Sequence, residues 1–123
     1  MKLYNAKDIL NIAIAGHSGA GKTSIAEAML YLSGATDRFG KVGEGNTVCD
    51  YDPEEIRRKT TVSAAIAPLE WRNHKINLLD APGLFDFEGA MCEAVRAADS
   101  VLIAVSGKDG VSVGTEKAYE AAS

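Results

Sequence analysis

Residues 16–23 read Gly16-His17-Ser18-Gly19-Ala20-Gly21-Lys22-Thr23 and match the pattern G-x-x-x-x-G-K-[ST] in full. The glycines let consecutive backbone N–H groups turn inward around an anion, and a helix that starts at the loop adds the positive end of its dipole. Lys22 can reach terminal phosphates, and the Thr23 hydroxyl can ligate Mg²⁺, which prefers oxygen ligands. The stretch therefore predicts a phosphate-binding loop.

The flanking residues supply the context that this motif requires. Residues 9–15 form a nearly continuous apolar run, which favours a strand buried on both faces of a parallel sheet. Residues 22–33 place apolar side chains at helical spacing, namely Ile25, Met29, Leu30 and Leu32. Ser33-Gly34 is a stop signal for that helix. The alternative, a glycine-rich turn that matches the motif by chance, is not favoured between a buried strand and a helix.

The middle of the chain predicts a long loop followed by a hairpin. Residues 34–60 contain four glycines and no clear periodicity, and a loop of this length is more often functional than structural. Residues 61–71 alternate, with one face formed by Val62, Ala64, Ile66 and Pro68. Pro68 places this strand at a sheet edge. Arg72-Asn73 forms the turn to a return strand over residues 74–79.

The last third of the chain predicts a helix, a strand and a second helix. The helix covers residues 86–98 and turns four side chains inward, those of Met91, Ala94, Val95 and Ala98. A buried strand follows over 100–106, then a loop from Gly107 to Gly110, and a helix over 113–123. The whole order indicates an α/β layered chain whose sheet is mostly parallel with one antiparallel edge hairpin. Together with the phosphate-binding loop, this order predicts the three-layer fold of P-loop NTPases.

A helix that follows a parallel strand normally leads to another strand. We therefore expect residues 1–123 to be part of a domain, truncated after the fourth strand and the following helix. Strand 100–106 would then expose an apolar edge, so we expect this stretch alone to be poorly soluble or weakly folded.

Composition excludes several classes of protein. Hydrophobic residues make up 46% and charged residues 24%, which is a globular balance. No apolar run approaches the roughly 18 residues of a membrane span, and the net charge of −4 argues against direct nucleic-acid binding. The two cysteines, Cys49 and Cys92, lack metal-site spacing. Charges near the N-terminus are unlike a signal peptide, so we expect a cytoplasmic protein.

A second candidate element is Asp80-Ala81-Pro82-Gly83, directly after the return strand. Asp80 can hold Mg²⁺ through water, and the Gly83 N–H can meet a terminal phosphate. The pattern alone is often a simple turn, but behind a phosphate loop the functional interpretation is favoured.

Two further positions have open alternatives. Thr60 or Thr61 could complete the Mg²⁺ shell when a terminal phosphate is present, although spacing alone favours residues that simply start a strand. His17 could act as a base, but a loop histidine that packs or makes one local hydrogen bond is favoured.

With these elements in place, the chain resembles the N-terminal part of the GTP-binding domain of translational GTPases, specifically elongation factor G and its elongation-factor-G-like relatives. The phosphate loop has their Gly-His-x-x-x-Gly-Lys-Thr form, and Ser18-Gly19 is similar to the elongation-factor-G-like branch. The stretch from residues 40–47 to residues 63–65 resembles the first switch of the family. Residues 75–83 with Asp86-Phe87 resemble the second, and residues 110–117 resemble the helix after the fourth strand.

The resemblance implies binding of GTP and GDP with Mg²⁺, hydrolysis of GTP to GDP and phosphate in the complete protein, and the ribosome as partner. It implies a set of phosphate-binding residues: His17, Ser18, Gly19, Ala20, Gly21, Lys22, Thr23, Ser24 and Gly83. Alignment on residues 63–65 makes Thr60 the switch threonine. The implied metal ligands are then Thr23, Thr60 and, through water, Asp80.

Two departures from the family pattern matter. Hydrolysing members usually carry a water-orienting histidine after the Asp-x-Pro-Gly glycine, but this chain has Leu84, so no catalytic residue is assigned. The guanine-reading Asn-Lys-x-Asp motif is absent from the 123 residues. A P-loop ATPase or kinase and a non-hydrolysing nucleotide-gated switch are therefore the alternative functions.

Overall fold

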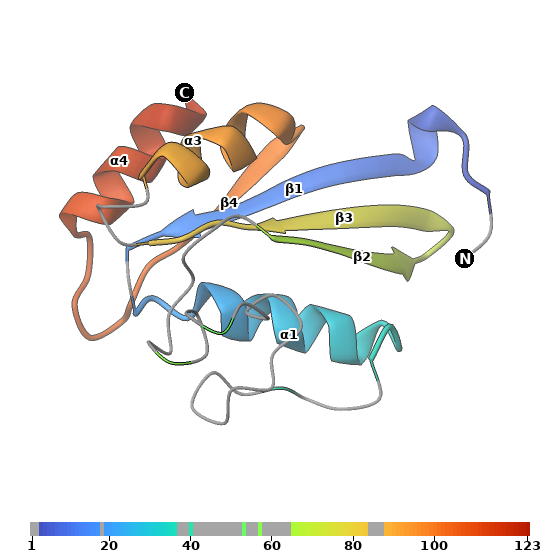
Figure 1. Ribbon diagram of the computed structural model, residues 1–123, viewed down its shortest axis with the longest axis horizontal. Helices are drawn as coiled ribbons and strands as arrows, with labels where there is room; N and C mark the ends of the chain where they lie inside the picture. The colour runs from blue at the N-terminus through green and yellow to red at the C-terminus, as the bar shows by residue number, and fades with distance from the viewer. Residues whose placement is uncertain are drawn as a thin grey trace.

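The computed structural model describes residues 3–17, 19–36, 65–83 and 88–123, together with positions 40, 53 and 57 (Figure 1). Most of the predicted long loop therefore lies outside the described residues. The elements, in chain order, are a short 3-10 helix η1 (Ala6–Asp8), β1 (Ile9–Gly16), α1 (Lys22–Leu32), β2 (Ala65–Trp71), β3 (His74–Asp80), α3 (Glu88–Ala97), β4 (Ser100–Ala104) and α4 (Val113–Ala122). This order confirms the predicted one.

Within the described residues, the strands form one sheet in the order β2-β3-β1-β4. β1 pairs in parallel with both β3 and β4, and β2 pairs antiparallel with β3. The prediction of a mostly parallel sheet with one antiparallel edge hairpin is thus confirmed. Pro68 lies on the edge strand β2, where a residue without an N–H is tolerated.

Helices cover both faces of the sheet, so the predicted three layers are present (Figure 1). α1 packs on one face through a cluster that includes Ile14, Leu30 and Leu78. α3 and α4 pack on the other through a cluster that includes Ala13 and Met91. Successive residues of β1 thus point into different core layers, which explains its continuous apolar sequence. None of the described helices is long and apolar enough to span a membrane.

Two burial predictions, for the strands over residues 9–15 and 100–106, were wrong in detail. Leu10 in β1 and Leu102 in β4 are each 39% exposed, so neither strand is buried along its whole length. Leu32, at the end of α1, is also exposed. Helices cover only part of each sheet face, because α3 and α4 lie over β1 and β4 while α1 lies over β1, β2 and β3.

The alternation of β2 divides its side chains into a buried and an exposed face. Ala65, Ala67 and Leu69 are buried against α1, whereas Ile66 is 69% exposed and Pro68 is exposed as well. Val62 and Ala64, which completed the predicted face, lie outside the described residues.

Residues with positive φ mark the turn between β2 and β3 and the end of α1. Arg72 and Asn73 both have positive φ, 47° and 64°, as a two-residue hairpin turn requires. Gly34 has a φ of 80° and follows the end of α1. The N–H of Ala35 donates to the Leu30 carbonyl at 3.0 Å, which closes the helix in a Schellman motif.

The N-terminal segment is attached to the edge hairpin. The hydroxyl of Tyr4 donates a hydrogen bond to the Glu70 carboxylate. This bond, followed by desolvation and the charge of Glu70, raises the pKa of Tyr4 to about 12. The contact lies away from the phosphate loop, because Glu70 pairs with Lys75 at the turn end of the hairpin.

Candidate functional site

The candidate site lies where β1 and β3 end side by side. Ile14 is paired with Asp80, and the N–H of Ala81 donates to the Ile14 carbonyl at 3.1 Å. Helix α1 begins at Lys22, just after the loop that leaves β1. Open α/β sheets bind ligands outside the carboxyl ends of their parallel strands. The motif and the Asp80 element therefore meet at the edge where a ligand is expected.

Backbone conformation explains the glycines of the loop. Gly19 and Gly21 have φ values of 81° and 89°, a region that residues with a side chain rarely adopt. Gly16 has a φ of 148°, and a Cβ there would lie 2.4 Å from the Ala104 carbonyl oxygen of β4. The loop closes on itself through a 3.2 Å hydrogen bond from the Ala20 N–H to the His17 carbonyl.

Lys22 lies beneath the loop rather than in solvent. Its side chain is only 6% exposed, and its ammonium group donates to the His17 carbonyl at 2.9 Å. The positive charge of Lys22 thus lies at the N-terminus of α1, where the helix dipole already attracts anions. This arrangement suits a group that carries several negative oxygens.

Thr23 and Asp80 form the oxygen side of the site. The Thr23 hydroxyl donates to Asp80 Oδ2 at 2.7 Å, and both residues are buried, Asp80 completely. A hydroxyl beside a carboxylate fits Mg²⁺, which is often held by few protein oxygens together with substrate phosphates. In the described part of the chain, no three His, Cys, Asp or Glu residues gather into a metal cluster. The hydroxyl of Thr23 and the carboxylate of Asp80 thus fit a cation that phosphate oxygens also bind.

His17 uses its backbone and its side chain separately. Its carbonyl accepts from Lys22 and Ala20, while Nδ1 of its imidazole accepts from the Gly114 N–H at 3.1 Å. The prediction was a histidine that packs or makes one local hydrogen bond. Its partner, however, is 97 residues away in the sequence, at the start of α4.

The remaining predicted residues are only partly described. Gly83 is half-buried just beyond the buried Pro82, and Ser24 is exposed on the first turn of α1. Ser18, Thr60, Thr61 and Leu84 lie outside the described residues. The structure therefore brings together His17, Lys22, Thr23 and Asp80.

Sequence reasoning missed two residues next to the site. Gly114 donates a hydrogen bond to His17. The sequence feature that could have indicated this contact is a glycine at the second position of a helix, where most other residues favour the helix more. Glu27 is a completely buried acid one turn beyond Thr23. The sequence could have indicated the burial of Glu27, because its spacing places it on the same helical face as Thr23 and Leu30.

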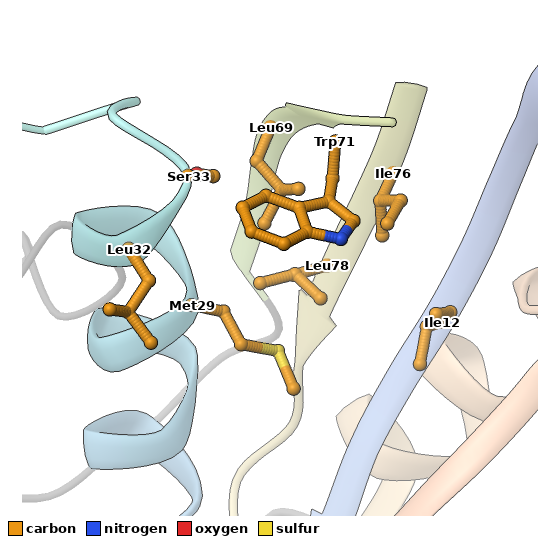
Figure 2. A pocket seen from close by; sticks show the side chains of 8 residues that line it. All are labelled: Ile12, Met29, Leu32, Ser33, Leu69, Trp71, Ile76 and Leu78. Carbon is orange, nitrogen blue, oxygen red and sulfur yellow. The ribbon is translucent and has the colours of Figure 1, made fainter. Parts of the chain in front are cut away.

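An apolar pocket of about 290 Å³ lies at the far end of α1 from the loop. Figure 2 shows Met29 and Leu32 of α1 facing Trp71, Leu69 and other side chains of the sheet. Apart from Ser33, the side chains that line it are apolar: Ile12, Met29, Leu32, Leu69, Trp71, Ile76 and Leu78. It has no charge to offer a phosphate, so it is separate from the candidate site.

Comparison with known proteins gives a family for the chain. The sequence model of the elongation factor Tu GTP binding domain matches residues 7–123. The ribosome-releasing factor 2, mitochondrial, of Scheffersomyces stipitis is 44% identical over 91% of this chain. The elongation factor G-like protein of Mycobacterium tuberculosis is 39% identical over 91% of it. The chain spans only 13% and 16% of the lengths of these two relatives.

Solved structures share the fold. A crystal structure of a Thermus thermophilus protein superposes with a TM-score of 0.90 at 50% identity, over 93% of this chain and 17% of the other. Translation elongation factor SelB of Methanococcus maripaludis, in complex with the GTP analogue GppNHp, gives a TM-score of 0.66 at 22% identity, over 91% and 19%. The second likeness is evidence of fold alone.

Proposed function

Because the chain belongs to the elongation factor Tu GTP binding domain family, we propose that it is the phosphate-binding part of the GTP-binding domain of an elongation-factor-G-like translational GTPase. One observation carries the proposal: Lys22, Thr23 and Asp80 are buried together under a glycine loop at the carboxyl ends of β1 and β3. Residues 1–123 would then form only part of that domain.

Each residue has a distinct role in this proposal. The N–H groups of the loop from His17 to Thr23 and Ser24 surround the phosphates, and the Lys22 ammonium neutralises their charge. The Gly83 N–H approaches the terminal phosphate. Thr23, Thr60 and, through water, Asp80 would hold Mg²⁺, which would offset the negative charge of the phosphates.

The first test is Lys22→Ala in the complete protein. Lys22 supplies charge-assisted hydrogen bonds to phosphate, and these are stronger than neutral ones, so we expect the affinity for Mg²⁺–GDP to fall on the order of 100-fold or more. Binding of a fluorescent GDP derivative measures the change. The matched control is Lys108→Ala, because Lys108 is exposed in the loop after β4. Unchanged binding by the Lys22 variant would rule out the phosphate-loop assignment.

Guanine selection and ribosome binding belong to the same proposal and need their own test. The relatives are named for ribosome release and for elongation factor G, which supports a ribosomal partner. We expect unlabelled GTP, but not ATP, to displace the fluorescent GDP from the complete protein. Displacement by ATP at equal concentration would favour a P-loop ATPase or kinase.

A second candidate function is a nucleotide-gated switch that does not hydrolyse GTP. Leu84 favours it, because leucine cannot hydrogen-bond an attacking water where relatives of the family usually have histidine. GTP turnover by the complete protein in the presence of ribosomes separates the two functions. Stimulated release of phosphate supports the GTPase, whereas nucleotide binding without turnover supports the switch.

A further inference from the structure

His17 connects two parts of the chain that are distant in sequence. Its carbonyl accepts a hydrogen bond from the Lys22 ammonium at 2.9 Å, and its imidazole Nδ1 accepts one from the Gly114 N–H at 3.1 Å. One residue thus holds the cation of the phosphate loop on its main chain and the start of α4 on its side chain.

The imidazole serves as a cap for α4. The first N–H groups of a helix have no partner within the helix. The Ser112 N–H donates to Thr115 Oγ1 at 3.3 Å, and the Gly114 N–H, one residue inside the helix, donates to His17. Because a backbone N–H can only donate, Nδ1 must carry a lone pair, so the imidazole proton of a neutral His17 is on Nε2.

The contact requires glycine at position 114. A Cβ there would lie 2.6 Å from His17 Nδ1 and 2.7 Å from His17 Cα. Real Cβ atoms essentially never come this close to another heavy atom. Gly89 occupies the same second position in α3, yet a Cβ there would meet nothing within 4 Å. The requirement at Gly114 therefore comes from the approach to His17 and not from helix geometry.

We propose that His17 is a positioning residue that joins the phosphate loop to α4 through Gly114, so that the placement of α4 sets the affinity of the loop for nucleotide. The inference rests on the proposed function of the loop. It adds a role for the start of α4, where Gly114 lies against the loop. The imidazole acts through the His17 carbonyl and Lys22, and not on the nucleotide directly.

The side-chain test compares His17→Ala with His17→Asn in the complete protein. Alanine removes the acceptor, and we expect the affinity for fluorescent Mg²⁺–GDP to fall roughly 3- to 10-fold, the change that corresponds to one net hydrogen bond. Asparagine places its Oδ1 as many bonds from Cα as Nδ1, so we expect it to restore most of the affinity. Equal loss in both variants would overturn the acceptor role.

The glycine test approaches the same contact from α4. Gly114→Ala keeps the imidazole but forces the helix away from the loop, so we expect a loss at least as large as that of His17→Ala. The matched control is Gly89→Ala, which adds the same methyl group at the same helical position without a contact, and we expect its affinity to stay within about 2-fold. Wild-type affinity for Gly114→Ala would overturn the proposal.

The outcome separates this inference from the proposed function. If Lys22→Ala abolishes binding while His17→Ala and Gly114→Ala bind like the wild type, the phosphate loop stands and the coupling to α4 is wrong. If Lys22→Ala binds normally, the proposed function fails and this inference fails with it.

Discussion

At the scale of single residues, the contact between Thr23 and Asp80 is the strongest support for the candidate site. Their bond is 2.7 Å long and buried, although 57 positions separate them in the sequence. Both residues were predicted to approach the same cation, from a motif and from a strand end. Parallel pairing of β1 and β3 makes the approach necessary, since it places Asp80 beside Ile14 at the end of the sheet.

This pair gives a stability prediction. Thr23→Ala removes a buried donor to a carboxylate, and we expect the free energy of unfolding to fall by about 1–3 kcal/mol. Thr23→Ser keeps the hydroxyl and should lose less. Urea denaturation of both variants measures the difference. If the two variants lose the same stability, the bond between Thr23 and Asp80 contributes nothing measurable.

At the scale of elements, the hairpin turn between β2 and β3 depends on two residues with positive φ. Asn73 has a φ of 64°, which asparagine tolerates better than most side chains. We expect Asn73→Val to destabilise the chain by about 1–2 kcal/mol, because a β-branched residue is strained in this region. Asn73→Gly is the control, since glycine adopts the conformation freely. Thermal unfolding checks both, and an equal effect of valine and glycine would contradict the assigned turn.

The elements also differ in how far their burial could be predicted. Met91, Ala94 and Val95 of α3 are buried as their helical spacing predicts. In β2, the alternation put Ile66 and Pro68 on one face, and that face is exposed. Period-two alternation separates the two faces of a strand but does not say which face a helix will cover. That choice was made by the packing of α1 on β2.

At the scale of the whole molecule, the sheet ends at β4 within the described residues. Leu102 is 39% exposed on this edge strand, and Val105 just after it is 48% exposed. Exposed apolar edges favour pairing with another chain. We therefore expect the 123-residue chain, when expressed alone, to self-associate.

Leu102→Lys tests this expectation. A charge on an edge strand opposes pairing with a second copy, so we expect the variant to show a larger monomer fraction in sedimentation velocity. Leu32→Lys adds the same charge on α1, away from the edge, and controls for a general effect of charge. A wild-type chain that is entirely monomeric, or equal effects of the two variants, would contradict the role of this edge.

The sequence by itself determined the elements and their order, the turn at Arg72-Asn73, and the loop from Gly16 to Thr23. These features follow from contacts between near neighbours in the chain, such as side-chain periodicity and backbone conformation, which local sequence encodes. Only the tertiary structure decided that α1 covers Ala67 rather than Ile66, and that Gly114 meets His17. Both contacts depend on how separate elements pack in space, and the spacing of two residues along the chain does not give the distance between them in the fold.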